Sequence, residues 1–296
     1  MKFKFSFIIA VTALGFLSCK KDATEAPAGP TVNFIFKFDS TQVRLDGQGN
    51  ISLLPANHAG QSPRFNSMSA HYLELTPNQF TLPGAGQVLY KAPEVTTGGS
   101  KAIDFSQAKF AGNNQVFLSV PLSSLAAGTY NWLRVSLAYQ NYNVYVNASA
   151  GGQNFVLDAT VASFIGFNTY VASHKIKDSI VVENANKLQG YWAFETSIPG
   201  FGGMVRKGQA PPGATTVPNP LFATSPIPAG SCLVTGQFSA PLVITGAGTT
   251  DINIIVSLST NKSFEWINAD GNNSYDPLNG DAVVDMGIRG MVPRKQ

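Results

Sequence analysis

Apolar side chains recur at every second position over short stretches of this chain, and this alternation limits the fold more than any other feature. Residues 32–39 carry Val32, Phe34, Phe36 and Phe38 on one face and mostly polar side chains between them. Successive side chains of a β-strand point to opposite faces of its sheet, so such a stretch predicts a strand with one buried face. The chain is therefore expected to build its core from β-strands.

The same alternation returns along the chain between turns rich in Gly, Pro and Asn. It predicts clear strands at 116–120, 133–139 and 252–258, and shorter ones near 70–75, 86–90, 154–162, 175–183, 188–196, 232–238, 241–245, 262–267 and 282–288. No segment has a sustained 3.6-residue apolar period with capping residues. Many short strands separated by turns are typical of an antiparallel β-sandwich or β-barrel, and we favour a sandwich of the immunoglobulin or jelly-roll kind. We expect an all-β fold with one large domain, residues 32–290, and a tail at 291–296.

Residues 197–230 interrupt this rhythm with seven prolines and many glycines. Structureless connections of this length are uncommon inside compact domains, and are usually functional loops or linkers. A linker would leave too few residues behind it for a second sandwich, which needs about 100. We therefore favour a long loop laid over a single sandwich.

The N-terminus has the features of a secretory signal. Lys2 and Lys4 precede an apolar run over residues 5–17, and Ser18 and Cys19 follow it. A basic start, a short apolar core and a small residue before the cleavage site mark a signal peptide. The run is shorter than the roughly 20 residues that a membrane-spanning helix needs.

The end of this signal, Phe16-Leu17-Ser18-Cys19, resembles the lipobox of bacterial lipoproteins. That family prefers Leu at the third position before the cysteine, where this chain has Phe16. The resemblance implies that residues 1–18 are removed and that Cys19 is acylated with palmitate-like chains. More than one acyl chain gives stable membrane anchoring. Lys20 follows the cysteine instead of the Asp that favours the inner membrane, so the implied location is the outer membrane, facing the periplasm or the cell surface.

Removal of the signal also changes the charge of the chain. Residues 1–18 contain two of the 20 basic residues, which leaves 18 against 17 acidic ones and a net charge of +1. Residues 19–31 would form a short lipidated tether without a basic block. Nucleic-acid binding proteins need clustered Lys and Arg, so nucleic acid is not an expected partner.

The chain has two cysteines, and lipidation of one leaves the other alone. If Cys19 carries lipid, Cys232 has no partner for a disulfide. Free cysteine behaves as a small apolar residue when it is buried, and its reactivity depends on thiolate formation. We expect a buried thiol at the start of a strand and no disulfide.

A second motif lies between Trp266 and Pro277. Side chains that carry oxygen fall at alternate positions, namely Asn268, Asp270, Asn272, Ser274 and Asp276. Ca²⁺ takes six to eight oxygen ligands, and alternate spacing in a tight loop directs successive oxygens toward one ion. Calcium is therefore the candidate cofactor, with Asp281 or Asp285 as a further carboxylate ligand.

This loop resembles the DxDxDG calcium loops of EF-hands and dockerins, and more closely the Asp- and Asn-rich loops of extracellular β proteins. Asn273 stands where the EF-hand has its invariant Gly, and Asn279 where it has a bidentate Glu. With amides in place of carboxylates, the expected dissociation constant is on the order of 10⁻⁴–10⁻³ M. The alternative is a turn between two strands, held by Asx hydrogen bonds without an ion.

The sequence contains no catalytic motif. His58, His71 and His174 lack the paired spacing of a zinc site, and no nucleophile elbow, P-loop or dinucleotide-binding motif is present. His71 shares parity with Leu73 and Leu75, so we expect a histidine that is buried or hydrogen-bonded. Lone carboxylates form no evident catalytic pair. An enzyme is not the favoured class.

Tyrosines alternate with amides around residue 142. Tyr139, Tyr142 and Tyr145 lie among Gln and Asn, a mixture that stacks on sugars and bonds to their hydroxyl groups. They are candidate ligand-facing aromatics. Packing within the sheet is the alternative, because Tyr is favoured in strands and Tyr139 continues the apolar face of residues 133–137.

The order of elements also resembles a family of periplasmic β-sandwich proteins, the methanobactin-partner-like copper-binding domains. The resemblance rests on a Phe-rich first strand (Val32–Asp39), a strand at Phe65–Leu75, an Ala-Gly-Thr-Tyr…Leu-Arg segment at 127–137, and an aromatic strand at 190–195. The strand near His71 lacks that family's Tyr-Ile-Ser-Asn pattern. The resemblance implies a β-sandwich and copper handling with a partner protein, but this chain has no matching ligand set and no copper residue is assigned.

Together these features predict a lipoprotein anchored to the outer membrane that serves as an extracytoplasmic binding or structural module. Calcium would stabilise its C-terminal loop, and an envelope protein or a glycan would be its partner. Periplasmic copper handling and glycan binding or glycan chemistry at the surface are the alternatives.

Overall fold

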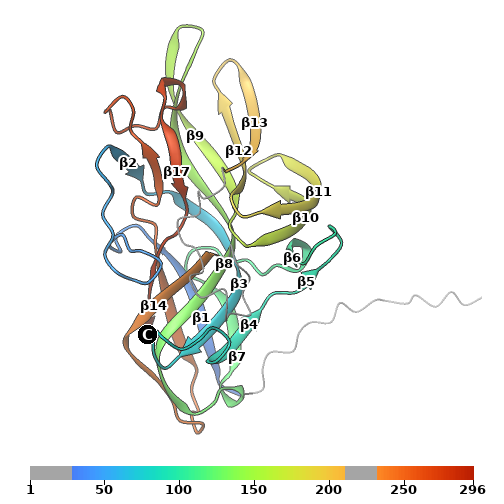
Figure 1. The fold of residues 1–296 in the computed structure, drawn as a ribbon, viewed down its shortest axis with the longest axis vertical. Helices are drawn as coiled ribbons and strands as arrows, with labels where there is room; N and C mark the ends of the chain where they lie inside the picture. Colours follow the sequence, from blue (N-terminus) through green and yellow to red (C-terminus); the bar gives the residue numbers. More distant parts are fainter. Residues whose placement is uncertain (1–28, 211–231) are drawn as a thin grey trace, which may run out of the picture.

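The computed structural model describes residues 29–210 and 232–296, and in these ranges the fold is all-β. Its elements are strands and three one-turn 3₁₀-helices, with no α-helix in the described part of the chain. Several mainly antiparallel sheets stack around shared cores (Figure 1). The predicted class, an all-β sandwich-like domain, is confirmed.

The chain runs through these elements in order: β1 (Thr31–Asp39), β2 (His58–Gln61), β3 (Arg64–Thr76), β4 (Gln87–Lys91), β5 (Glu94–Val95), β6 (Ala102–Asp104), η1 (Phe105–Gln107), β7 (Gln115–Pro121), η2 (Leu122–Ser124), β8 (Gly128–Ala150), β9 (Gln153–Phe164), β10 (Asn168–Lys175), β11 (Ile180–Leu188), β12 (Tyr191–Ile198), β13 (Gly202–Gln209), β14 (Cys232–Ile244), β15 (Ile252–Ser259), β16 (Phe264–Ile267), η4 (Pro277–Asn279), β17 (Ala282–Met286) and β18 (Met291–Lys295).

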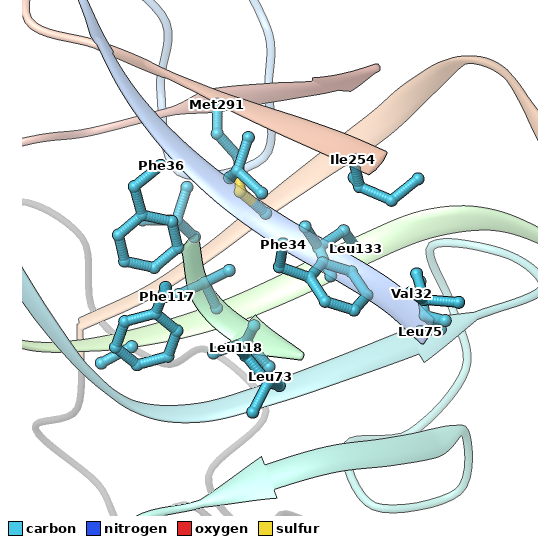
Figure 2. Close-up of a cluster of buried hydrophobic side chains, with 14 of the residues drawn as sticks. Val32, Phe34, Phe36, Leu73, Leu75, Phe117, Leu118, Leu133, Ile254 and Met291 are labelled. Atoms are coloured by element: carbon cyan, nitrogen blue, oxygen red, sulfur yellow. The ribbon is translucent and has the colours of Figure 1, made fainter. Parts of the chain in front are cut away.

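One end of the molecule is a two-layer sandwich. A four-stranded sheet in the order β18-β15-β1-β7 packs on β14, β3, β4 and the first half of β8. Figure 2 shows the side chains that meet between the layers; those of the first strand, Val32, Phe34 and Phe36, are fully buried. Removing such apolar surface from water is the main favourable contribution to folding. The main core therefore lies where the clearest alternation in the sequence predicts it.

The other end has three layers. β8 continues there beside β9, β12 and β13, so these strands form a wall in the middle. The sheet β17-β16-β2 packs on one face of the wall, and the sheet β11-β10-β6-β5 packs on the other (Figure 1). Both faces of the wall are thus partly covered by other elements.

A β-bulge at Ala138 joins the two ends. Opposite β3, Tyr139 pairs with Ser69 and Leu137 with Ala70, so Ala138 is an extra residue on β8. An extra residue reverses which parity of side chains faces a given side. Before the bulge, odd-numbered residues such as Leu137 enter the main core, and beyond it even-numbered residues such as Tyr142 face the β16 side.

Two expectations about parity are wrong, one because of this bulge on β8 and the other because of a second bulge on β3. Tyr139 does not continue the face of residues 133–137, because it lies beyond Ala138 and packs in a different cluster with Phe164. His71 is an extra residue on β3 and does not join Leu73 and Leu75. Its ring is fully buried, contacts Phe167 and lies 3.1 Å from the Glu94 carboxylate through Nε2, so burial and hydrogen bonding are confirmed.

Several element boundaries also differ from those expected. Residues 202–209 form β13, so the predicted loop at 197–230 begins with a hairpin, and its residues 211–230 lie outside the described ranges. The predicted tail forms β18, which pairs with β15. The stretch 175–183 contains the turn between β10 and β11, and the strands predicted at 232–238 and 241–245 form one strand, β14 (Cys232–Ile244). Two pairings, β1 with β15 and β6 with β10, are parallel.

The alternation predicted for residues 116–120 is wrong at Val116. Val116 is 49% exposed, whereas its neighbour Phe117 is buried and stacks on Phe36. The register between β1 and β7 shifts at Phe34 and Ile35. That irregularity turns Val116 outward, and sequence parity cannot anticipate it.

A buried histidine makes the stability of this fold depend on pH. His174 is 3% exposed and contacts the rings of Phe164 and Tyr191 edge-on. Burial lowers its pKa from 6.5 to about 4. The unfolded chain therefore binds a proton at a higher pH than the folded one, and stability is lost as the pH falls through this window.

We expect His174→Phe to reduce this loss, because Phe keeps the ring packing and does not titrate. Between pH 7 and pH 5 the free energy of unfolding of the wild type should fall by about 2 kcal/mol more than that of the variant. Urea denaturation at the two pH values measures the difference. Equal pH dependence in both proteins would contradict the assignment.

Candidate functional site: an apolar cavity

The described structure contains a cavity of about 700 Å³. It lies between the wall of β8, β9, β12 and β13 and the segment that runs from β16 through β17 to Ile288. Pockets that bind small molecules usually measure about 300–1,000 Å³ and have mainly apolar walls with a few polar groups. This cavity has the size and the lining of such a pocket.

Strand alternation builds the sheet side of the cavity. On β12, Trp192, Phe194, Thr196 and Ile198 face inward, whereas Ala193 and Glu195 face the β10 side. Val161 of β9 pairs with Phe194 and belongs to the same face. Because side chains two residues apart share a face, one strand contributes a row of large apolar groups to the cavity.

A glycine on the neighbouring strand leaves the space that the Trp192 side chain occupies. Gly208 on β13 pairs with Trp192, and a Cβ atom at Gly208 would lie 2.7 Å from Cζ2 of the indole. The indole thus lies directly over the backbone of the edge strand. A larger residue at position 208 would displace Trp192, so the shape of this wall depends on a residue without a side chain.

The opposite side of the cavity is aromatic and aliphatic. Phe264, Val283, Met286 and Ile288 line it, and Tyr275 contacts the Phe264 ring at a centroid distance of 5.1 Å. The wall is fastened to β8 by hydrogen bonds at both ends. The Asn147 N–H donates to the Tyr275 carbonyl at 2.8 Å, and the Tyr142 hydroxyl donates to the Met286 carbonyl at 2.6 Å.

Only two of the described residues that line the cavity carry a charge, and they differ in their surroundings. Asp285 is 6% exposed and lies 3.3 Å from Nε of Arg289, which neutralises it. Arg206 on β13 is exposed, pairs with Phe194 and donates from Nη1 to the Val205 carbonyl. Within the described residues no carboxylate lies within ion-pair distance of Arg206. The rim of the cavity therefore carries a positive charge without a counter-charge.

Cys232 lines the inner part of the cavity, where β14 begins. It is a free, buried thiol, as the sequence predicts. Burial raises its pKa to about 12, and the charge of Asp285 adds to the increase. A thiol of this kind is protonated at neutral pH and is a poor nucleophile. Its role is to pack.

The candidate calcium residues form a loop beside the cavity, and their oxygens accept hydrogen bonds from the loop itself. Asp270 accepts from the Asn272 backbone and Asn272 from the Ser274 backbone, at 3.1 and 2.6 Å. Asn268 accepts from Asn273, whose φ of +61° supplies the left-handed turn that Gly would allow.

Two carboxylates hold the end of this loop. Asp281 is 6% exposed and accepts from the backbone N–H groups of Ala269 and Asp276 at 2.9 and 2.8 Å. Asp276 in turn accepts from the backbone of Leu278 and the amide of Asn279. These bonds fix Tyr275 and Leu278 at the cavity wall. Within the described ranges, no group of three or more His, Cys, Asp or Glu is arranged to hold a metal ion, and calcium binding stays a prediction.

The three candidate tyrosines do not share a surface. Tyr139 and Tyr142 are 4% and 0% exposed and pack in clusters on opposite faces of the wall. Tyr145 is 52% exposed, with the guanidinium of Arg64 4.7 Å from its ring centroid. A surface on which sugars stack needs several exposed aromatic rings on one side. Of these three tyrosines, only Tyr145 has an exposed ring.

The lone carboxylates and histidines of the sequence have separate structural contacts. Glu265 accepts from Arg44 and contacts His58, Glu74 accepts from the backbone of Gly84 and Gly86, and Glu195 accepts from the backbone of residues 177–179. Asp158 pairs with Arg64, and Asp104 caps η1. None of these contacts joins two of the carboxylates into a pair of the glycosidase kind.

Cys19, the predicted lipidation site, lies outside the described residues. Across the parts of the chain that the structure describes, no helix is long and apolar enough to cross a membrane. Comparison with known proteins adds no family: no family model, no curated protein and no solved structure matches this chain.

Sequence reasoning missed the cavity. Its members come from β8, β9, β12, β13, β14 and β17, which are far apart in the chain, and each reads as an ordinary strand residue. A weak signal was present in β12, where Trp192 and Phe194 alternate with Tyr191 and Ala193. Large apolar groups on both parities predict a strand with two covered faces, and the cavity lies on one of them.

Calcium binding to the 268–281 loop is testable through thermal stability. We expect millimolar Ca²⁺ to raise the melting temperature by about 3 °C relative to chelator, since a ligand that binds only the folded state stabilises it. Asp270→Ala should abolish this difference. Asp46→Ala is the matched control, because Asp46 accepts from the backbone of Gln48 and Asn50 in a separate turn. Equal melting of the wild type with calcium and with chelator would contradict the prediction.

Proposed function

We propose that this protein is a lipid-anchored binding module of the cell envelope that holds an apolar or amphiphilic small molecule in the cavity between β12 and β17. The observation that carries the proposal is the cavity itself. A hollow of about 700 Å³ with Trp192, Phe194 and Met286 in its walls exposes apolar surface that a ligand would remove from water.

The construction of the walls also supports a binding role. One wall is a sheet fixed by strand pairing, and the other is held to β8 through Tyr142 and Asn147. A cavity whose shape exists before the ligand arrives loses little conformational freedom on binding. Binding to such a site needs no rearrangement of the sandwich.

The residues that line the cavity offer little for covalent chemistry. Its thiol, Cys232, is protonated, and its carboxylate, Asp285, is paired with Arg289. Catalysis of group transfer requires a nucleophile or a general base within reach of the substrate. Binding is therefore the function that this lining supports best.

Filling the cavity should abolish binding of an apolar probe. We expect the double variant Ala148→Trp and Met204→Trp to weaken binding of N-phenyl-1-naphthylamine at least tenfold, because both side chains line the cavity. Probe fluorescence would be titrated on a Cys19→Ala background, so that no acyl chain of the protein itself contributes.

The matched control places the same two indoles on the other face of the wall. Val156 and Val205 are 71% and 36% exposed. They are the sequence neighbours of Leu157 and Met204, which line the cavity, so their side chains point to the opposite face. Val156→Trp with Val205→Trp should bind the probe as the parent does. Absence of probe binding by the parent protein would refute the proposed function.

The anchor has a separate test. Cys19→Ala should stop incorporation of labelled palmitate and move the protein from the membrane fraction to the soluble fraction, since the acyl chains provide the membrane affinity. Fractionation of cells expressing each form measures this. Retention of Cys19→Ala in membranes would show that the lipobox resemblance is misleading.

A further inference from the structure

We infer that the ligand of this cavity is an acidic amphiphile, with an aliphatic body between the walls and a carboxylate or a similar anionic group bound by Arg206 at the rim. The inference rests on the proposed function and specifies the chemical class of its ligand. It depends on the position of one guanidinium relative to the apolar lining.

Arg206 belongs to the same face as the apolar row. It pairs with Phe194 across β12 and β13, and Met204, two residues before it, lines the cavity as well. Residues two apart on a strand share a face. The guanidinium is exposed to solvent, whereas Val161, which pairs with Phe194 from the other side, is 2% exposed. The positive charge thus lies at the open edge of an apolar interior.

The charges around the cavity favour an anion at this edge. Asp285, the other charged residue of the lining, is paired with Arg289. Lys207 projects to the opposite face, where its Nζ lies 3.0 Å from the Glu183 carboxylate. Arg206 alone, among the described charged groups of the lining, carries a charge that no carboxylate balances. A planar guanidinium binds carboxylates with two parallel hydrogen bonds.

An acidic amphiphile matches both parts of this arrangement. Its chain would take apolar surface from water on each side of the cavity, and its head group would stay near solvent beside Arg206, which limits the desolvation cost of the charge. A neutral amphiphile would gain only the first contribution. A ligand with a cationic head would meet an uncompensated positive charge.

The test compares dodecanoate with 1-dodecanol, which share the chain and differ in the charge of the head group. In the assay each compound competes with N-phenyl-1-naphthylamine, a neutral probe, for the Cys19→Ala protein at neutral pH. We expect Arg206→Gln to lower the affinity for dodecanoate relative to dodecanol about fivefold, the effect of one partly exposed ion pair. Arg206→Lys should keep most of the preference.

Lys207→Gln is the matched control. It removes the same charge one residue away on the other face and should leave the ratio of the two affinities unchanged. The inference would be overturned if Arg206→Gln left the ratio of dodecanoate to dodecanol affinity unchanged, or if Lys207→Gln changed it by as much. Either result would leave the proposal of ligand binding in the cavity intact. If neither compound displaces the probe, or the probe does not bind, the proposed function itself fails.

Discussion

The exchange of partners along one edge of β8 is the constraint on which the rest of the structure depends. From Gly128 to Leu137 this edge pairs with β14, and from Tyr139 to Ala150 it pairs with β9. Ala138 lies at the junction, and its carbonyl accepts from the N–H groups of Ile165 and Gly166 at 2.9 and 3.0 Å. The two partner strands therefore meet end to end at a single bulged residue.

One end of the cavity lies at this junction. On either side of Ala138, β14 continues into the sandwich and β9 into the wall. Cys232 at the start of β14 and Ile165 beyond the end of β9 both line the hollow. From this end the cavity extends between the wall and the segment that runs from β16 through β17 to Ile288. The irregularity at Ala138 thus lies where the sandwich, the wall and the cavity meet.

Much of the fold could be predicted from the sequence because the core strands alternate cleanly. Val32, Phe34 and Phe36 and the row from Leu133 to Leu137 are buried as their parity indicates. The errors occur where a bulge or a short edge strand intervenes. Tyr139 and Val116 change faces at register shifts, and β13 and β18, which were assigned to a loop and a tail, gain their strand structure from partners distant in the chain. Local propensity contains no information about such partners.

By itself the sequence determined the β class, the burial of Cys232 and the main sandwich core, because period-two alternation and side-chain hydrophobicity act over a few residues. It also indicated a loop of oxygen-bearing side chains after Trp266, but not that Asp281 would bind the backbone of that loop. Only the tertiary structure decided that Phe194, Arg206 and Met286 surround one hollow. Their neighbourhood depends on strand order and on the bulge at Ala138, and both are consequences of long-range pairing that no short segment of the chain encodes.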